Sequence, residues 1–178
     1  MSDNFGIGRN AVETAAGRDD RRYLDLALSL ADLAEQEGSL PVGAVVVGPD
    51  GAVLGTGRNR ILTGGGPTAH AEMEALYDAG ARLGEPASKG SCTVYTTMEP
   101  CLMCAGALLL SEIARVVWVV NDPKRGALRD YVAHPGYADL FAKLTMTETP
   151  DPQLAVRMRA QLAAWFARQG WDNQRWLE

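Results

Sequence analysis

Residues 96–107 of this 178-residue chain read Thr-Thr-Met-Glu-Pro-Cys-Leu-Met-Cys-Ala-Gly-Ala, with two cysteines three positions apart. The preceding run, Cys92 to Thr97, is rich in β-branched and aromatic residues and predicts a strand. The apolar run that follows predicts a helix whose first turns carry Cys101 and Cys104 on one face. A helix N-terminus favours the thiolate form of cysteine. Two thiolates make half of a tetrahedral zinc site, although a bare C-x-x-C also fits a redox pair or a chance pair.

The other half of a zinc site lies upstream, where Thr-Ala-His-Ala-Glu at 68–72 opens a helical run that extends to about Leu83. His70 offers an imidazole, and Glu72 offers a carboxylate two residues later. Together with Pro100-Cys101-Leu102-Met103-Cys104, these residues resemble the signature of zinc nucleobase deaminases, H-x-E followed by P-C-x-x-C. The alternative is a histidine that caps its own helix and an inert pair of cysteines.

The residue types in this pattern fit hydrolytic chemistry. His70, Cys101 and Cys104 as ligands leave one tetrahedral position for water, which is typical of catalytic zinc. Zinc lowers the pKa of bound water toward ~7, and Glu72 can take the proton from that water, pass it to a ring nitrogen and help carry one to a departing amine. We therefore expect one Zn²⁺ per chain. A structural zinc site with Glu72 as its fourth ligand is the alternative.

Length and composition favour one globular domain. The apolar fraction is 47%, and no window is long and apolar enough to predict a membrane span. The net charge of −5 argues against a polyanionic partner such as nucleic acid. Three cysteines without a disulfide pattern indicate a reducing compartment, and residues 1–22 lack the apolar core of a signal peptide. We expect a cytoplasmic protein without a membrane partner.

Hydrophobic periodicity predicts alternating helices and strands within one domain at 20–178, preceded by a loose extension at 1–19. Helices are expected at 20–37, from 70 to about 83, from 101 to about 110, and from about 154 to 166. Strands are expected at 42–47, 52–58, 92–97, 115–120 and 144–148, the first two forming a hairpin. This α/β pattern predicts a sheet covered by helices on both sides, with the later strands parallel.

The chain also resembles the cytidine/cytosine deaminase superfamily, and in particular the branch of bacterial tRNA adenosine deaminases and fungal-type cytosine deaminases. The matching segments are 40–45, 57–60, 67–72 and 96–107. The resemblance implies a three-layer α/β/α sandwich with a mixed five-stranded sheet, and usually a homodimer. It also implies that Asn59, the backbone N–H of Ala71 and the carbonyl of Glu99 contact the substrate. The alternative for Asn59 is a turn residue that satisfies its own loop.

Different segments of the chain resemble deaminases that act on different substrates. Residues 98–101 and 121–126 are similar to the tRNA enzyme, but residues 127–130 are not. The aromatic and acidic tail resembles the fungal-type enzyme, whose C-terminal Trp and Asp close over the base, which here implies Trp171 and Asp172. The alternative is that Trp171 and Trp176 pin the last helix to the core. We expect a small free base as substrate, cytosine first and guanine or a related heterocycle second. Deamination of adenosine in tRNA is the alternative, and a non-catalytic zinc protein the second alternative.

Overall fold

A hairpin of two strands starts the sheet. β1 (Gly43–Val47) is buried along its whole length and pairs antiparallel with β2 (Val53–Arg58). Gly51 in the connecting turn has a φ of +82°, a conformation that glycine adopts without strain. The computed structural model describes residues 18–128, 135–149 and 151–172.

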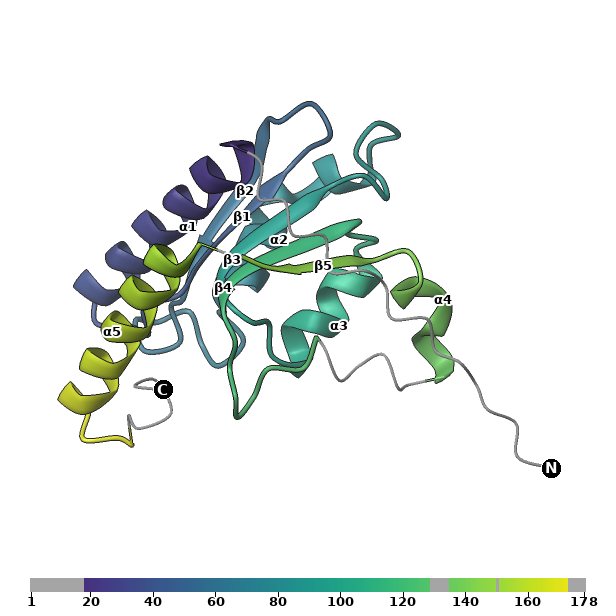
Figure 1. The fold of residues 1–178 in the computed structure, drawn as a ribbon. Coiled ribbons are helices and arrows are strands. Elements are labelled where there is room, and N and C mark those ends of the chain that lie inside the picture. Colours follow the sequence, from purple (N-terminus) through teal and green to yellow (C-terminus); the bar gives the residue numbers. More distant parts are fainter. Residues whose placement is uncertain (1–17, 129–134, 150, 173–178) are drawn as a thin grey trace.

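Three more strands complete a mixed sheet in the order β2-β1-β3-β4-β5 (Figure 1). β3 (Thr93–Met98) is antiparallel to β1, whereas β4 (Arg115–Val120) and β5 (Thr145–Glu148) continue the sheet in parallel. The predicted five-stranded mixed sheet is therefore confirmed. Because β3 and β4 are parallel neighbours, the loops after them meet at the same edge of the sheet, where ligands bind in open α/β sheets.

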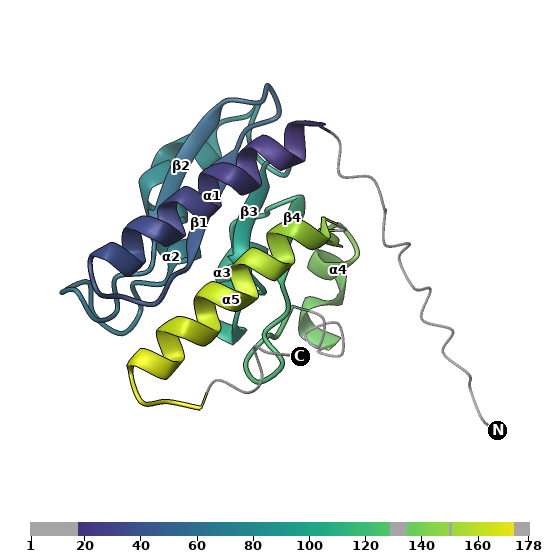
Figure 2. The ribbon, with the colours of Figure 1, turned by 60° about the vertical axis from the view of Figure 1, so that its left-hand side comes forward.

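Helices cover both faces of the sheet (Figures 1 and 2). On one face, α1 (Arg18–Gln36) and α5 (Pro152–Arg168) pack over residues such as Val45 and Val117. On the other, α2 (Ala71–Ala79), α3 (Leu102–Leu110) and α4 (Ala138–Phe141) pack over residues such as Val46 and Val116. Successive strand residues face opposite sides, so one apolar run supplies both cores. The three-layer α/β/α fold is confirmed.

The helix boundaries differ in detail from those expected. α1 begins at Arg18, and residues 1–17 of the expected extension lie outside the described residues. α2 ends at Ala79 rather than near Leu83, because Gly80 has a φ of +52° and a 3₁₀ helix, Gly80–Gly84, follows. Among the described helices, none combines the length and apolar character needed to cross a membrane.

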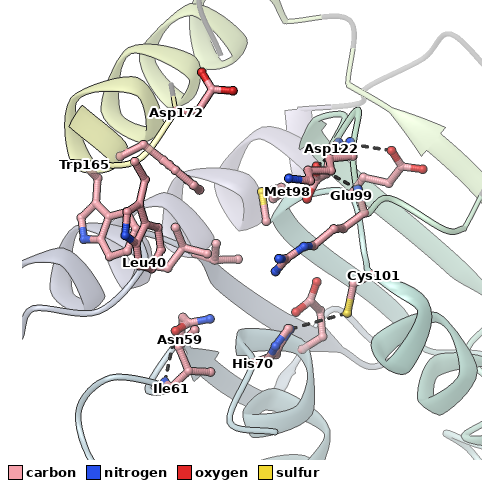
Figure 3. Close-up of a pocket in the computed structure, with 16 residues that line it drawn as sticks. Leu40, Asn59, Ile61, His70, Met98, Glu99, Cys101, Asp122, Trp165 and Asp172 are labelled. Atoms are coloured by element: carbon pink, nitrogen blue, oxygen red, sulfur yellow. Dashed lines mark hydrogen bonds between the residues drawn. The ribbon is translucent and has the colours of Figure 1, made fainter. Parts of the chain in front are cut away.

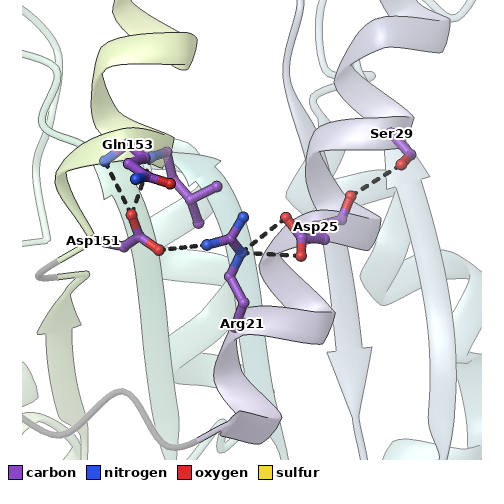
Figure 4. A network of polar contacts seen from close by, with 6 residues as sticks. Arg21, Asp25, Ser29, Asp151 and Gln153 are labelled. Atoms are coloured by element: carbon purple, nitrogen blue, oxygen red, sulfur yellow. Dashed lines mark hydrogen bonds and ion pairs between the residues drawn. The ribbon is translucent and has the colours of Figure 1, made fainter.

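Polar contacts join α1 and α5 side by side (Figure 4). Arg21 lies between Asp25 of its own helix and Asp151, with its Nη1 2.7 Å from Asp151 Oδ2. Asp151 is also the N-cap of α5, since its Oδ1 accepts hydrogen bonds from the backbone N–H groups of Gln153 and Leu154. Asp32 and Arg157 form a second ion pair between the two helices, at 2.6 Å. These contacts orient α5, whose C-terminal end reaches the site described below.

Candidate metal centre and active site

Two glycines in β2 let α2 lie directly against the strand. A Cβ on Gly57 would stand 2.1 Å from the carbonyl oxygen of Ala71, and a Cβ on Gly55 would stand 2.3 Å from that of Ala75. No side chain larger than hydrogen fits at either position without moving the helix. The close packing fixes the N-terminus of α2 over the sheet, and His70 is the N-cap of that helix.

The His70 side chain turns away from its own helix toward two sulfur atoms. Among the described residues it makes no capping hydrogen bond, so the self-capping alternative is not observed. Its Nδ1 lies 3.6 Å from Cys101 Sγ and 3.6 Å from Cys104 Sγ, and the two sulfurs are 3.7 Å apart. Metal bonds of about 2.3 Å to sulfur and about 2.05 Å to nitrogen at tetrahedral angles predict separations of about 3.8 Å and about 3.6 Å. The three side chains therefore fit one tetrahedral zinc ion.

The electrostatics of the two cysteines also suit a metal. Cys101 is the N-cap of α3 and Cys104 lies in its first turn. Hydrogen bonding by Cys104 and His70 lowers the pKa of the Cys101 thiol to about 4, so this sulfur is a thiolate at neutral pH. The same contacts raise the pKa of the Cys104 thiol, where the proton remains, and raise the pKa of His70. Binding of zinc would release these protons, as metal sites built from thiols and imidazoles do.

Glu72 lies beside the three candidate ligands. Its side chain is buried, with Oε2 3.5 Å from Cys104 Sγ and Oε1 3.4 Å from the hydroxyl of Thr96. Burial raises the pKa of the Glu72 carboxyl. The ligand atoms of His70, Cys101 and Cys104 all lie within 4.8 Å of one another, and Glu72 does not belong to this group. The geometry thus favours a zinc site with three protein ligands and Glu72 beside it over a structural zinc site in which Glu72 is the fourth ligand.

A cavity of about 360 Å³ opens next to these residues (Figure 3). Figure 3 shows His70 and Cys101 on one side of it and Leu40 and Trp165 across from them. Seven of the nine residues predicted for the site line the cavity, namely Asn59, His70, Glu72, Glu99, Cys101, Trp171 and Asp172. The other two, Cys104 and Ala71, are fully buried behind it. Ala71 is the first residue of α2, where backbone N–H groups have no acceptor within the helix.

Glu99, whose backbone carbonyl is expected to contact the substrate, also makes a contact through its side chain. Its side chain is 1% exposed, and its Oε2 accepts a hydrogen bond from the backbone N–H of Asp122 at 3.3 Å. A Cβ on Gly126 would stand 2.2 Å from the same oxygen. Cys101 and Gly126 also form a bridge between the two loops. The carboxylate of Glu99 therefore holds the loop after β4 against the turn that carries Cys101.

Aromatic side chains at the end of α5 form the far wall of the cavity. Trp165 packs edge-to-face on Phe166 and on Trp171, with ring centroids 5.3 Å and 5.5 Å apart. Trp171 also contacts Phe166 at 5.9 Å, and it remains 53% exposed. The two interpretations of Trp171 are thus compatible, since the side chain packs on α5 and lines the cavity together with Asp172. Trp176 lies outside the described residues.

Several residues of the cavity were not identified from the sequence as site residues. They come from the end of β3, from segments next to the strands and from helix α5: Leu40, Val42, Ile61, Met98, Asp122, Lys124, Arg125, Trp165 and Phe166. Val42, Trp165 and Phe166 belong to a predicted strand and a predicted helix, but nothing in the periodicity marks them as lining a cavity. Leu40, Ile61 and Met98 lie just outside the predicted strands. Asp122 follows β4, and the end of a parallel strand was the available signal.

Comparison with known proteins agrees with this geometry. The sequence model of the cytidine and deoxycytidylate deaminase zinc-binding region matches residues 17–120. A tRNA-specific adenosine deaminase of Haemophilus influenzae is 44% identical over 109 residues, covering 61% of this chain and 62% of the relative. A cytosine deaminase of Candida albicans is 40% identical over 103 residues, covering 58% and 67%. A tRNA(Ile)-lysidine synthase of Deinococcus deserti is 46% identical over 149 residues, covering 84% of this chain but 26% of the relative.

Solved structures show the same fold. A guanine deaminase from Bacillus subtilis is 37% identical, with a TM-score of 0.51 over 57% of this chain and 64% of that one. A guanine deaminase from Nitrosomonas europaea is 24% identical, and its fold matches with a TM-score of 0.64 over 94% of this chain and 98% of that one. The chain spans about a quarter of the Deinococcus protein and about two thirds of the two shorter relatives. From its matched region and its zinc-site geometry, the chain belongs to the cytidine and deoxycytidylate deaminase zinc-binding family.

Proposed function

We propose that the protein is a zinc-dependent hydrolytic deaminase that releases ammonia from a small free nucleobase or a related aminated heterocycle. The observation that carries the proposal is the cavity, where His70, Glu72 and Cys101 face the aromatic end of α5 across about 360 Å³. This volume is at the small end of the range for ligand pockets, and aromatic walls suit a flat ring.

The side chains support a division of labour in the reaction. His70, Cys101 and Cys104 would hold zinc, whose Lewis acidity makes water nucleophilic near neutral pH when the ion is bound. Glu72 is buried, and its raised pKa suits a group that takes a proton from water and returns it to the ring nitrogen of the substrate. Water adds to the amidine carbon, and its first proton passes through Glu72 to the ring nitrogen. The hydroxyl of this addition intermediate then gives its proton through Glu72 to the amine, the carbon–nitrogen bond breaks, and ammonia leaves. The products are ammonia and a ring carbonyl.

Cytosine is the first candidate base and guanine the second. A cytosine deaminase is among the 40%-identical relatives, and a solved guanine deaminase is 37% identical. Trp171 and Asp172 line the cavity, and Trp171 packs on the aromatic residues of α5. We infer that they close the site over the ring.

Deamination of adenosine in tRNA is the second candidate. The 44% identity to a tRNA-specific adenosine deaminase favours it, as does the likeness to a protein named for a tRNA-modifying reaction. Lys124 and Arg125 supply the structural observation, because both are exposed and line the cavity, where they suit a phosphate group. The net charge of −5 and the aromatic wall at the end of α5 favour the small base.

A screen for ammonia release separates the two candidates. Cytosine, guanine, adenine, isocytosine, their nucleosides and amino-triazines would be assayed beside a tRNA anticodon stem-loop, with Glu72→Gln as the inactive control. Turnover of a free base with no change in the stem-loop is the expected result. Deamination of the stem-loop alone would contradict the small-base proposal and support the second candidate.

The oligomeric state is a further expectation of the proposal. Leu102 and Leu110 at the two ends of α3 are 61% and 69% exposed, and Tyr77 on α2 is 89% exposed. These exposed apolar side chains, together with the homodimer that the resemblance implies, lead us to expect a homodimer. Light scattering at micromolar concentration would measure it, and a monomer would contradict it.

A further inference from the structure

The side-chain amide of Asn59 is held in one orientation, with its NH₂ group toward the cavity. The residue follows β2, is 2% exposed and lines the cavity. Its Oδ1 accepts a hydrogen bond from the backbone N–H of Ile61 at 3.2 Å and another from the hydroxyl of Ser39 at 2.8 Å. A backbone N–H can only donate, so the atom that faces it must be the oxygen of the amide. The orientation of Asn59 is therefore determined by its surroundings.

Ser39 is in turn held in place by the same loop. It is fully buried, and its Oγ accepts a hydrogen bond from the backbone N–H of Leu62 at 3.4 Å. A hydroxyl that accepts from a backbone N–H has its own hydrogen available, and here that hydrogen points to Asn59 Oδ1. In this arrangement the Leu62 N–H donates to Ser39, and the Ser39 hydroxyl donates to Asn59 Oδ1. If the amide of Asn59 were reversed, the Ile61 N–H would face its NH₂ group, and the Ser39 hydroxyl would lose the oxygen to which it donates.

The NH₂ group of Asn59 is left for the substrate. Among the described residues none accepts a hydrogen bond from Asn59 Nδ2, and this nitrogen is not one of the buried polar atoms that lack a partner. It is consequently accessible from the cavity that Asn59 lines. A donor held at this point selects a ring that presents an acceptor there, either a carbonyl oxygen or an unprotonated ring nitrogen.

From these contacts we infer that Ser39 is a positioning residue, which locks Asn59 as a hydrogen-bond donor and so restricts the substrate to rings with an acceptor at that edge. The inference rests on the proposed function in taking the cavity as the base site. Ser39 does not touch the substrate, and its effect passes through Asn59 alone. Loss of the hydroxyl leaves the Ile61 N–H as the one described donor to Asn59 Oδ1, so the amide is held less firmly in the orientation that presents its NH₂ group to the ring.

A double-mutant cycle tests this coupling. Ser39→Ala should raise KM about tenfold, the worth of about one hydrogen bond, with kcat changed less than about twofold and zinc content unchanged. Ser39→Thr keeps the hydroxyl and should restore most of the affinity. In an Asn59→Ala background, Ser39→Ala should have no further effect on KM. An equal effect in both backgrounds would show that Ser39 supports only the fold and would overturn the inference.

A second measurement needs no substrate. The side-chain amide signals of Asn59 in a ¹⁵N–¹H spectrum can be identified because they disappear in Asn59→Asp. They should shift or broaden in Ser39→Ala and stay near their wild-type positions in Ser39→Thr. Unchanged signals in Ser39→Ala would overturn the inference.

The two measurements separate this inference from the proposed function. If no free base releases ammonia, the small-base proposal fails, while the spectra still report on Ser39. If the stem-loop alone is deaminated, the same cycle can be run on that substrate. A base that is turned over with KM unchanged in Ser39→Ala would leave the proposed function standing and remove the role of Ser39.

Discussion

The cavity has two walls that are held by different kinds of contact. The metal wall carries His70, Glu72 and Cys101 on the first turns of α2 and α3, and backbone packing of α2 on Gly55 and Gly57 fixes it. The outer wall is the aromatic end of α5, where the rings of Trp165 and Trp171 pack on each other. Ion pairs with α1 at the surface hold the N-terminal half of the same helix. Backbone packing tolerates little change, whereas exposed side-chain contacts can change while the metal ligands stay in place. We therefore expect substitutions in the metal wall to change zinc binding and kcat, and substitutions in the outer wall to change KM.

The largest expected effect comes from the metal wall itself. Glu72→Gln should lower kcat by about 10²- to 10⁴-fold, because the proton shuttle is lost, while about one zinc per chain remains. Cys101→Ala should lose the metal, because a ligand is removed. Metal analysis and initial rates measure both. Full activity in Glu72→Gln would contradict the deaminase assignment, and loss of zinc from that variant would favour a closed structural site.

Substitution of Asp20, which lies away from both walls, should lower the stability of the fold without affecting the cavity. Asp20 accepts hydrogen bonds from Arg115 at 2.7 Å and from the hydroxyl of Tyr95 at 2.6 Å, and Arg115 begins β4 at the opposite end from the cavity. Asp20→Asn should lower the free energy of unfolding by about 1.5–3 kcal/mol, as expected for hydrogen bonds to a charged group, without changing KM. Denaturant titration measures the free energy of unfolding, and initial rates measure KM. A changed KM would show that the ends of the sheet are coupled.

The effect of Asp20→Asn should also depend on pH. Burial raises the pKa of the Asp20 carboxyl, but the hydrogen bonds from Arg115 and Tyr95 outweigh it and leave the pKa below its ordinary value. A depressed pKa in the folded state stabilises the protein above about pH 4, and this stabilisation is lost as the pH falls through the folded value. The difference in unfolding free energy between wild type and variant should therefore be constant near neutral pH and shrink below about pH 4. A difference that grows in acid would contradict this.

Gly57→Ala tests whether backbone packing fixes the metal wall. The new Cβ would stand 2.1 Å from Ala71 O and 2.4 Å from Ala75 N, so α2 must move. We expect a loss of about 1–3 kcal/mol in the free energy of unfolding, together with weaker zinc binding in competition with a chelator. Gly84→Ala is the matched control, since its Cβ would meet nothing within 4 Å. Equal zinc affinity in both variants would show that α2 is not positioned by this contact.

Trp171→Ala should have the smallest effect, and it should change only the affinity for the substrate. Loss of its ring from the outer wall should raise KM by a few-fold to about tenfold, with zinc content unchanged. Val156→Ala is the control, because this residue of α5 is 68% exposed and does not line the cavity. If Trp171→Ala lowered zinc binding as well, the separation between the two walls would be wrong.

The sequence was most informative where local pattern and chemistry coincide. The strands of the sheet are short apolar runs, and H-x-E with P-C-x-x-C lies at the starts of two helices, so the α/β fold and the ligands His70, Cys101 and Cys104 could be predicted. The side-chain role of Glu99 could not, because it depends on the loop after β4 lying beside the turn after β3. Ser39 gave no signal at all, since it is a single serine 20 positions from Asn59 and meets it only after β1 and β2 have paired.

The order of the elements along the chain has a consequence for biosynthesis. His70, Glu72, Cys101 and Cys104 all precede the end of β4, whereas β5 and α5 follow it. Chains emerge from the ribosome N-terminus first, so all the metal ligands are synthesised before the aromatic end of α5 exists. We therefore expect that a nascent chain can bind zinc while its cavity still lacks the wall formed by α5. Folding of α5 would then complete the cavity around a site that already holds its metal.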